Sequence, residues 1–163
     1  MHRRREGELS MTNGTDFFVQ TLITRAANDC NSARAHIRVA TDMRQVRRAA
    51  DVHTNPVIRA LPQVRQDVRS VHDAAEKRLD ALLDQQLQKL AACATGDEIR
   101  AEHARLLRND WFVLRGDFSR IYHRADREYL RLMHRAERQP APAAPMEEQE
   151  PPADEEEGSA PAP

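Results

Sequence analysis

The chain has 163 residues, of which only 4% are aromatic, and a mean hydropathy of -0.76, so it lacks the bulky apolar side chains that enclose a catalytic pocket in most globular enzymes. Its formal net charge is -1, but residues 139–163 hold seven acids and no Lys or Arg, which leaves 25 basic against 19 acidic side chains in residues 1–138. That basic excess is spread along the chain instead of being gathered with aromatic residues, which argues against nucleic-acid binding.

Residues 1–14 are predicted to form a flexible N-terminus. The basic residues 3–5 are followed by acids and not by an apolar segment, so this region is typical of neither a signal peptide nor a transit peptide. Met11 is an alternative to Met1 as the start of the chain. No run approaches the ~18 apolar residues of a membrane span. We therefore expect a cytoplasmic protein.

The first proline-free stretch predicts a helix over residues 15–52. Thr15 and Asp16 are favourable N-cap residues. Apolar residues then recur at steps of three and four, which places them on one helix face; they are Val19, Leu22, Ala26, Cys30, Ala33, Ile37 and Ala40. Cys30, like Cys93 further along, stands at an apolar position, so both are expected to be buried, reduced thiols.

A second helix is predicted over residues 60–94. The segment His53-Thr54-Asn55-Pro56 separates it from the first, because proline disfavours helical angles at the residue before it. Pro62 suits the first turn of the new helix, where its missing N–H is not needed. An apolar stripe again follows the helical period. We predict that its members bind a partner helix, in particular Val64, Val68, Val71, Leu83 and Leu90.

The third helix is predicted over residues 97–138, after a turn in which Thr95 or Asp97 can act as the N-cap. Its stripe carries the largest apolar side chains of the chain and is the strongest predicted partner contact; its members are Leu107, Trp111, Leu114, Phe118 and Ile121. Trp111 is interpreted either as a packing residue of the seam or as an anchor for a partner chain. Gly116 is expected to weaken the helix that contains it.

Residues 139–163 are rich in Pro, Ala and Glu without an apolar period, and they are predicted to be a disordered acidic tail. Residues 15–138 then form one helical coiled-coil region. Stripes of about two apolar residues in seven cover a seam and not a closed core. The predicted fold class is therefore all-α, with three long helices in an elongated coiled-coil arrangement.

Residues suited to catalysis do not assemble into a recognisable motif. The seven histidines are scattered, the serines lack a nucleophile elbow, and the five glycines are isolated, so no phosphate-binding loop is present. Asp97, Glu98 and Glu102 are explained by the preference of acids for a helix N-terminus. We predict that the chain is not an enzyme and has no catalytic residue, cofactor or metal ion.

Three segments carry a family resemblance. Phe18-Val19 opens the first helix, and His53-Thr54-Asn55-Pro56 follows it. After Trp111 comes a third segment with Asp126-Arg127-Glu128-Tyr129, Met133 and Arg135. In this order and spacing, residues 17–138 resemble the Muted family, subunit 5 of biogenesis of lysosome-related organelles complex 1. That family has a Phe-Val pair, a His-Thr-x-Pro break and a terminal Asp-x-Glu-His segment at similar places, and Tyr129 stands where His is more usual.

The resemblance implies a non-catalytic scaffold subunit in an elongated hetero-oligomer on endosomal membranes, which sorts cargo toward lysosome-related organelles. The expected partners are other small coiled-coil subunits, with no nucleic acid and with only peripheral membrane association through those partners. One alternative is a generic coiled-coil subunit of a cytoskeletal, kinetochore or other tethering assembly. Another is a small helical enzyme or a nucleic-acid binder, and the latter would show salt-dependent affinity for DNA or RNA.

Overall fold

A computed structural model describes residues 6–138, and their side chains from Gly14 onward except that of His53. The predicted tail, 139–163, and residues 1–5 lie outside the described residues. Within the described part the chain is helical and contains no strand, which confirms the all-α class. Its helices and 3₁₀ turns are, in chain order, α1 (Glu6–Val39), α2 (Met43–Ala50), η1 (Asp51–Thr54), α3 (Pro56–Arg59), η2 (Pro62–Val64), α4 (Arg65–Ala91), α5 (Gly96–Asn109), η3 (Trp111–Leu114) and α6 (Ser119–Arg138).

The helix predicted over residues 15–52 is two helices. α1 begins at Glu6, nine residues before the predicted start, and the flexibility predicted for residues 1–14 stays a prediction. The break comes at Asp42, the N-cap of α2, whose carboxylate accepts a hydrogen bond of 2.8 Å from the Gln45 N–H. Before the break, the Arg78 guanidinium donates hydrogen bonds of 2.6 and 2.9 Å to the Ala40 carbonyl. Polar groups at the break are thus satisfied by side chains.

The chain turns between α2 and α4 through three short elements. Asn55 caps α3, and its side-chain oxygen accepts a hydrogen bond of 3.0 Å from the Val57 N–H. Pro56 and Pro62 each lie in the first turn of a short element, where the missing N–H has no partner to lose. The helix predicted over 60–94 is therefore shorter, because α4 begins only at Arg65 after η2.

The helix predicted over residues 97–138 is also interrupted. Its start is as predicted: Thr95 caps α5 and accepts a hydrogen bond of 3.2 Å from the Glu98 N–H, while the Glu98 carboxylate accepts one of 3.3 Å from the Thr95 N–H. Gly116, expected inside the helix, instead lies in a turn before α6 with φ of 81°, a left-handed conformation that glycine adopts without strain. The turn separates α5 from α6.

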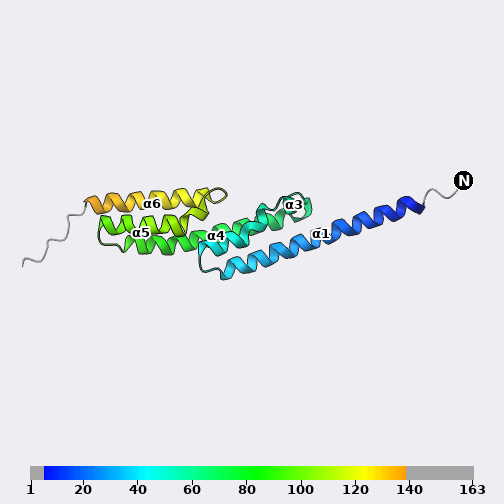
Figure 1. The fold of residues 1–163 in the computed structure, drawn as a ribbon, viewed down its shortest axis with the longest axis horizontal. Helices are drawn as coiled ribbons and strands as arrows, with labels where there is room; N and C mark the ends of the chain where they lie inside the picture. Colours follow the sequence, from blue (N-terminus) through cyan, green and yellow to red (C-terminus); the bar gives the residue numbers. More distant parts are fainter. Residues whose placement is uncertain (1–5, 139–163) are drawn as a thin grey trace, which may run out of the picture.

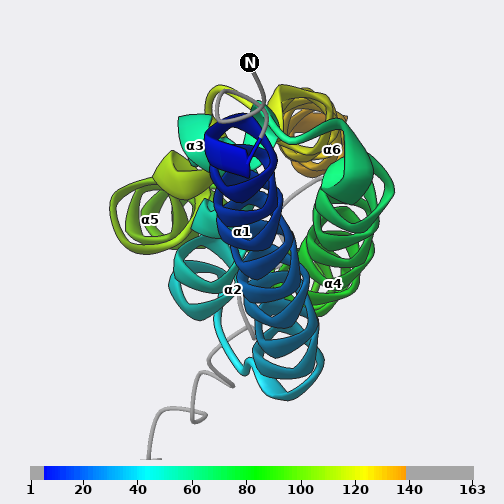
Figure 2. The same cartoon turned by 90° about the vertical axis from the view of Figure 1, so that its right-hand side faces the viewer.

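The helices alternate in direction and form two three-helix bundles in series (Figures 1 and 2). The end of α1, α2 and the first half of α4 make one bundle; the second half of α4, α5 and α6 make the other. Ion pairs show that α4 and α6 run parallel, because Arg120 lies 2.9 Å from Glu76 and Arg124 lies 3.0 Å from Asp80. α4 is thus the helix that both bundles share. The described chain thus has six α-helices in place of the predicted three long ones, and the predicted coiled-coil arrangement is not confirmed.

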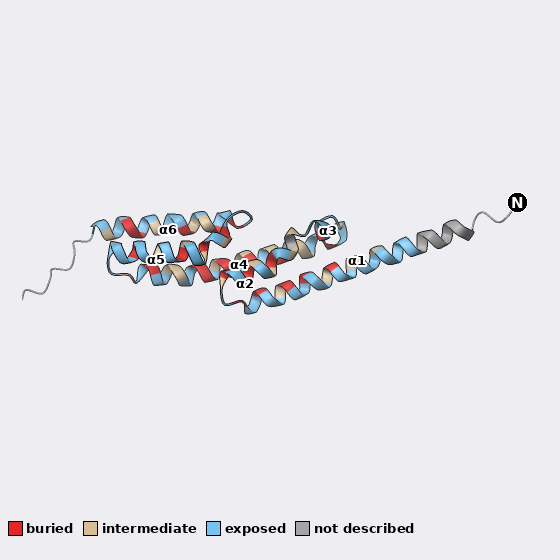
Figure 3. Ribbon diagram, in the orientation of Figure 1, coloured by how far each residue is buried: buried red, intermediate tan, exposed pale blue. Residues whose placement is uncertain are grey.

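The apolar stripes of the helices face each other and form one continuous core (Figure 3). α1 contributes Ala26, Cys30, Ala33 and Ile37, which are buried at the spacing that the sequence predicts. The first half of α1 has no helix of the described chain beside it and projects from the bundle as an arm (Figure 1). Residues 14–22 of this arm, the part whose side chains the structure describes, contribute nothing to the core.

Two arginines of α2 connect the bundles at their junction. Arg44 donates a hydrogen bond of 2.7 Å to the Asn109 carbonyl at the end of α5, and it also lies over the Phe112 ring. Arg47 pairs with Asp117 at 3.4 Å and lies 5.4 Å from the centre of the buried Phe118 ring. The turn before α6 is therefore held against α2 by both charge and packing.

Candidate docking surface

Most of the residues predicted to bind a partner lie in the core of the chain itself. Eight of them are at most 1% exposed, namely Val64, Val71, Leu83, Leu90, Trp111, Leu114, Phe118 and Ile121. The other two, Val68 and Leu107, are half-buried and pack against that core. A partner would have to open the bundles to reach the eight buried side chains. Their role in partner binding stays a prediction. The apolar side chains that a partner can reach without opening the bundles lie elsewhere on the surface.

Trp111, which belongs to the apolar stripe of the third predicted helix, is buried by side chains of the same chain. Its Nε1–H donates a hydrogen bond of 2.8 Å to the Gln86 side chain on α4, so the indole nitrogen is satisfied on burial. The His103 ring of α5 lies edge-on to it, with the centres 5.3 Å apart, and stacks on Tyr129 of α6 at 3.5 Å. Trp111, His103 and Tyr129 thus connect α4, α5 and α6.

His103 is a partly buried histidine of the C-terminal bundle whose protonation is expected to oppose folding. Its Nε2 is buried with no hydrogen-bond partner among the described residues, and burial lowers the pKa of the imidazole, a change that Asp126 opposes. The unfolded chain therefore binds this proton more tightly than the fold does. We expect the free energy of unfolding to fall as the pH drops below ~6.5, the unfolded pKa, by at most ~1.4 kcal/mol per pH unit from this one group.

The measurement is urea unfolding between pH 7.5 and 5 of the natural chain and of His103→Gln. The variant should show a shallower loss of stability with falling pH. His134→Gln is the control, because His134 lies at the surface of α6 beside Glu137 and its side chain is 70% exposed. Equal pH slopes for the natural chain and His103→Gln would exclude His103 as the source.

The arm of α1 continues the helix face that is buried in the body. Val19 and Leu22 precede Ala26 at steps of three and four, so they lie on the same face as the buried stripe. Within the body that face packs against α2 and α4, whereas Val19 and Leu22 are only partly buried and lie outside the core. The arm therefore carries an apolar seam for which the described chain provides no partner helix.

Two phenylalanines on the arm are among the most exposed large apolar side chains of the described chain. Phe17 is 76% exposed and Phe18 is 63% exposed. At 100° per residue, Phe18 borders the face that carries Val19, and Phe17 points to the opposite side of the helix. Two adjacent exposed phenylalanines on a projecting helix are unfavourable in water, and they typically mark a contact surface.

A groove extends this surface onto the body where α1 leaves it. Leu22 and Ala26 line one side of the groove, and Val57, Ile58 and Leu61 of the α3 segment line the other, around about 260 Å³ of space. Val57 is itself 60% exposed. We name the combination of Phe18, Val19, Leu22 and Val57 the arm surface. It is an apolar surface that runs from the arm onto the body, and Arg25, Asp29 and Asn55 add polar groups beside it.

The described residues offer little for chemistry. Among the side chains that the structure describes, no three His, Cys, Asp or Glu residues come together as metal ligands. Burial raises the pKa of the Cys30 thiol, which keeps it protonated and unreactive, whereas Cys93 is only partly buried, less than predicted. In this part of the chain, no helix combines the length and the apolar character needed to cross a bilayer.

No protein-family model, curated protein or solved structure matches the chain. The interpretation of the arm surface therefore stands on the residues that form it. The resemblance to the Muted family remains an expectation from three short segments.

Proposed function

We propose that the chain is a non-catalytic scaffold subunit that binds a helix of a partner subunit along the arm of α1. The observation that supports this most is the continuity of the α1 stripe: its C-terminal part is covered by helices of the same chain, and its N-terminal part, with Val19 and Leu22, is not. Adding a helix there repeats the packing already present in the N-terminal bundle.

The proposed occupant is an amphipathic helix with an apolar seam. The part of the arm with described side chains, Gly14 to Leu22, is about 14 Å long at 1.5 Å per residue, which is long enough for between two and three turns of contact. The groove beside α3 supplies a place where such a helix ends against the body. Short helices of this kind are stable mainly when their apolar faces are buried in a complex.

For the identity of the complex we propose the one that the resemblance suggests, an assembly of small coiled-coil subunits for endosomal cargo sorting and the biogenesis of lysosome-related organelles. Two of the three resembling segments border the arm surface, because Phe18-Val19 lies on the arm and Asn55 lines the groove. The chain would then be cytoplasmic and would reach endosomal membranes through its partners. The alternative is a subunit of a cytoskeletal, kinetochore or other tethering assembly.

Co-expression tests this proposal. The chain is produced together with each small helical subunit of the endosomal sorting complex, and the products are separated by size-exclusion chromatography with mass determination. A stable pair that is lost on Val19→Asp supports the proposal in full. A pair that survives Val19→Asp contradicts the arm surface as the docking site. Failure with every subunit, together with Val19-dependent binding to a cytoskeletal or kinetochore subunit, favours the alternative assembly.

A further inference from the structure

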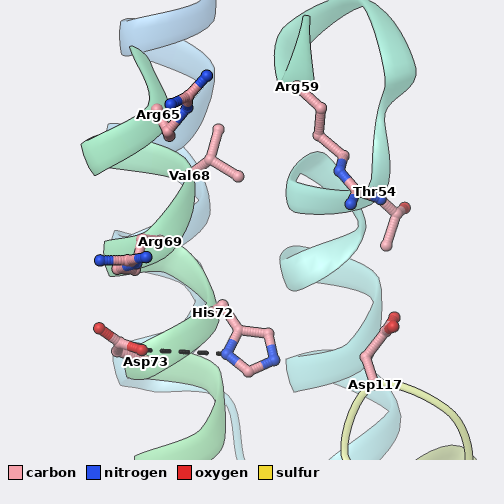
Figure 4. A pocket seen from close by; sticks show the side chains of 8 residues that line it. All are labelled: Thr54, Arg59, Arg65, Val68, Arg69, His72, Asp73 and Asp117. Atoms are coloured by element: carbon pink, nitrogen blue, oxygen red, sulfur yellow. Dashed lines mark ion pairs between the residues drawn. The ribbon is translucent and has the colours of Figure 1, made fainter. Parts of the chain in front are cut away.

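A basic groove lies between α4 and the α3 segment, on a different set of residues from the arm surface. Arg65 and Arg69 come from successive turns of α4, and Arg59 faces them from the end of α3 (Figure 4). The groove encloses about 440 Å³ and is open to solvent. We name Arg59, Arg65 and Arg69 the arginine cluster.

The arginine cluster differs from most other interhelical arginines in having no acidic partner. Among the described residues, none of its three guanidinium groups is part of an ion pair, whereas Arg34 pairs with Asp67 at 3.5 Å and Arg120 pairs with Glu76. The like charges of the arginine cluster repel one another across the groove. An anionic ligand with several carboxylates would relieve this repulsion.

Two acids also line the groove, and they are outnumbered by its three arginines. Asp117 pairs with Arg47 at 3.4 Å, and Asp73 lies 4.0 Å from Nδ1 of His72 on its own helix (Figure 4). Thr54 and Val68 complete the lining without adding charge. The groove therefore presents a net positive surface, suited to an acidic peptide because guanidinium groups bind carboxylates in a two-pronged geometry.

We propose that the acidic segment Asp154-Glu155-Glu156-Glu157 of the same chain binds the arginine cluster. These four consecutive carboxylates lie in residues 139–163, which contain no Lys or Arg that would compete with the cluster for them. Attachment to α6 gives the segment an effective concentration in the millimolar range, so contacts that are individually weak can be occupied. The bound tail excludes other polyanions from the groove.

The length of the tail allows the segment that begins at Asp154 to reach the arginine cluster, whereas the earlier acid Glu147 lies too close to Arg138 along the chain. α4 and α6 are parallel and in register at the Arg120–Glu76 pair, so a rise of 1.5 Å per residue puts Arg138 about 38 Å from Arg69 and about 44 Å from Arg65 along the helix axes. An extended proline-rich chain gains about 3.1 Å per residue. At that rise the chain from Arg138 reaches only about 28 Å at Glu147 but about 50 Å at Asp154.

The test compares two matched double variants of the full chain, Glu156→Gln/Glu157→Gln and Glu147→Gln/Glu148→Gln, by NMR of the arginine Nε–H groups. We expect the signals of Arg59, Arg65 and Arg69 to shift in the first variant and to stay unchanged in the second, although both lose two charges. Arg105, which pairs with Glu102 within α5, is the internal reference whose signal should not move.

Three results would overturn the proposal. The first is identical cluster signals in the full chain and in a chain ending at Arg138. The second is equal shifts in the two double variants, which would indicate that the arginines respond to the total negative charge of the tail and not to docking of one segment. The third is a shift that disappears on dilution, since it would assign the acidic segment to another copy of the chain. Loss of the shift near 1 M salt, where the screening length is about 3 Å, supports the proposal.

Discussion

Replacing Phe118 by Ala should destabilise the isolated chain by about 3–5 kcal/mol, a large part of the 5–15 kcal/mol that holds a typical domain together. Phe118 is completely buried at the junction of the two bundles. Its ring stacks on His72 of α4 at 5.1 Å between centres, and the guanidinium of Arg47 of α2 lies over it. The substitution leaves a cavity that helices fixed by several ion pairs cannot fill. Urea unfolding followed by circular dichroism measures the loss.

Phe112→Ala is the matched control, six residues earlier in the same segment. Phe112 is 45% exposed, and its contact with Arg44 is worth about 0.5–1 kcal/mol at such a site. Its loss should therefore cost about 1 kcal/mol or less. If Phe118→Ala unfolds at the same urea concentration as the natural chain but fails to bind a partner subunit, Phe118 is a partner contact, as the sequence predicts, and not a core residue.

Replacing Val19 by Asp should weaken partner binding at least about 30-fold, because a hot-spot contact is worth about 2 kcal/mol or more and a buried unpaired charge is strongly disfavoured. Val19 is at the centre of the arm surface but outside the core of the chain. The substitution should therefore leave urea unfolding of the isolated chain unchanged. Isothermal titration against the partner subunit found by co-expression measures the affinity.

The control for this prediction is Phe17→Asp. Phe17 is more exposed than Val19 and carries a larger apolar side chain, yet it points to the opposite side of α1. Its replacement should change the affinity less than about threefold, as expected for charges outside the contact. If instead Phe17→Asp abolishes binding and Val19→Asp does not, the partner binds the far side of the arm, and the continuity of the α1 stripe is irrelevant to docking.

Helix content could be predicted well from the sequence, but the interruptions of the helices could not. The cap at Thr95 and the turn after the first helices follow from side chains whose local hydrogen bonding is specific. The break at Asp42 has an N-cap residue as its signal, but an aspartate is equally common on the exposed face of a continuous helix. The apolar period also continues through η3, since a 3₁₀ turn and a short loop keep the same residues buried.

The candidate site was only partly accessible to sequence reasoning for a different physical reason. Periodicity identifies side chains such as Trp111 and Ile121 that must be buried, but the hydrophobic effect has no direction and does not select the covering helix. Here α4 covers the apolar stripe of α1 in one bundle and that of α6 in the other, because the turns of the chain place these helices beside it. Val19 and Leu22 belong to the predicted stripe of the first helix. Only the structure shows that no helix covers them, because the α3 segment borders the groove at Leu22 without closing it.

The sharing of α4 between the two bundles has a thermodynamic consequence. Each half contains roughly 60 residues, a size at which a domain buries only about 60% of its surface and is marginally stable alone. Leu79, Leu82 and Leu83 lie near the middle of α4 and are buried there, so no boundary free of core contacts divides the helix. If either half unfolds, apolar side chains of α4 become exposed to water, and the other half loses part of the packing that stabilises α4. We therefore expect the body to unfold in a single cooperative transition, so that stability gained in one bundle, for example on binding a partner at the arm, is shared by the other.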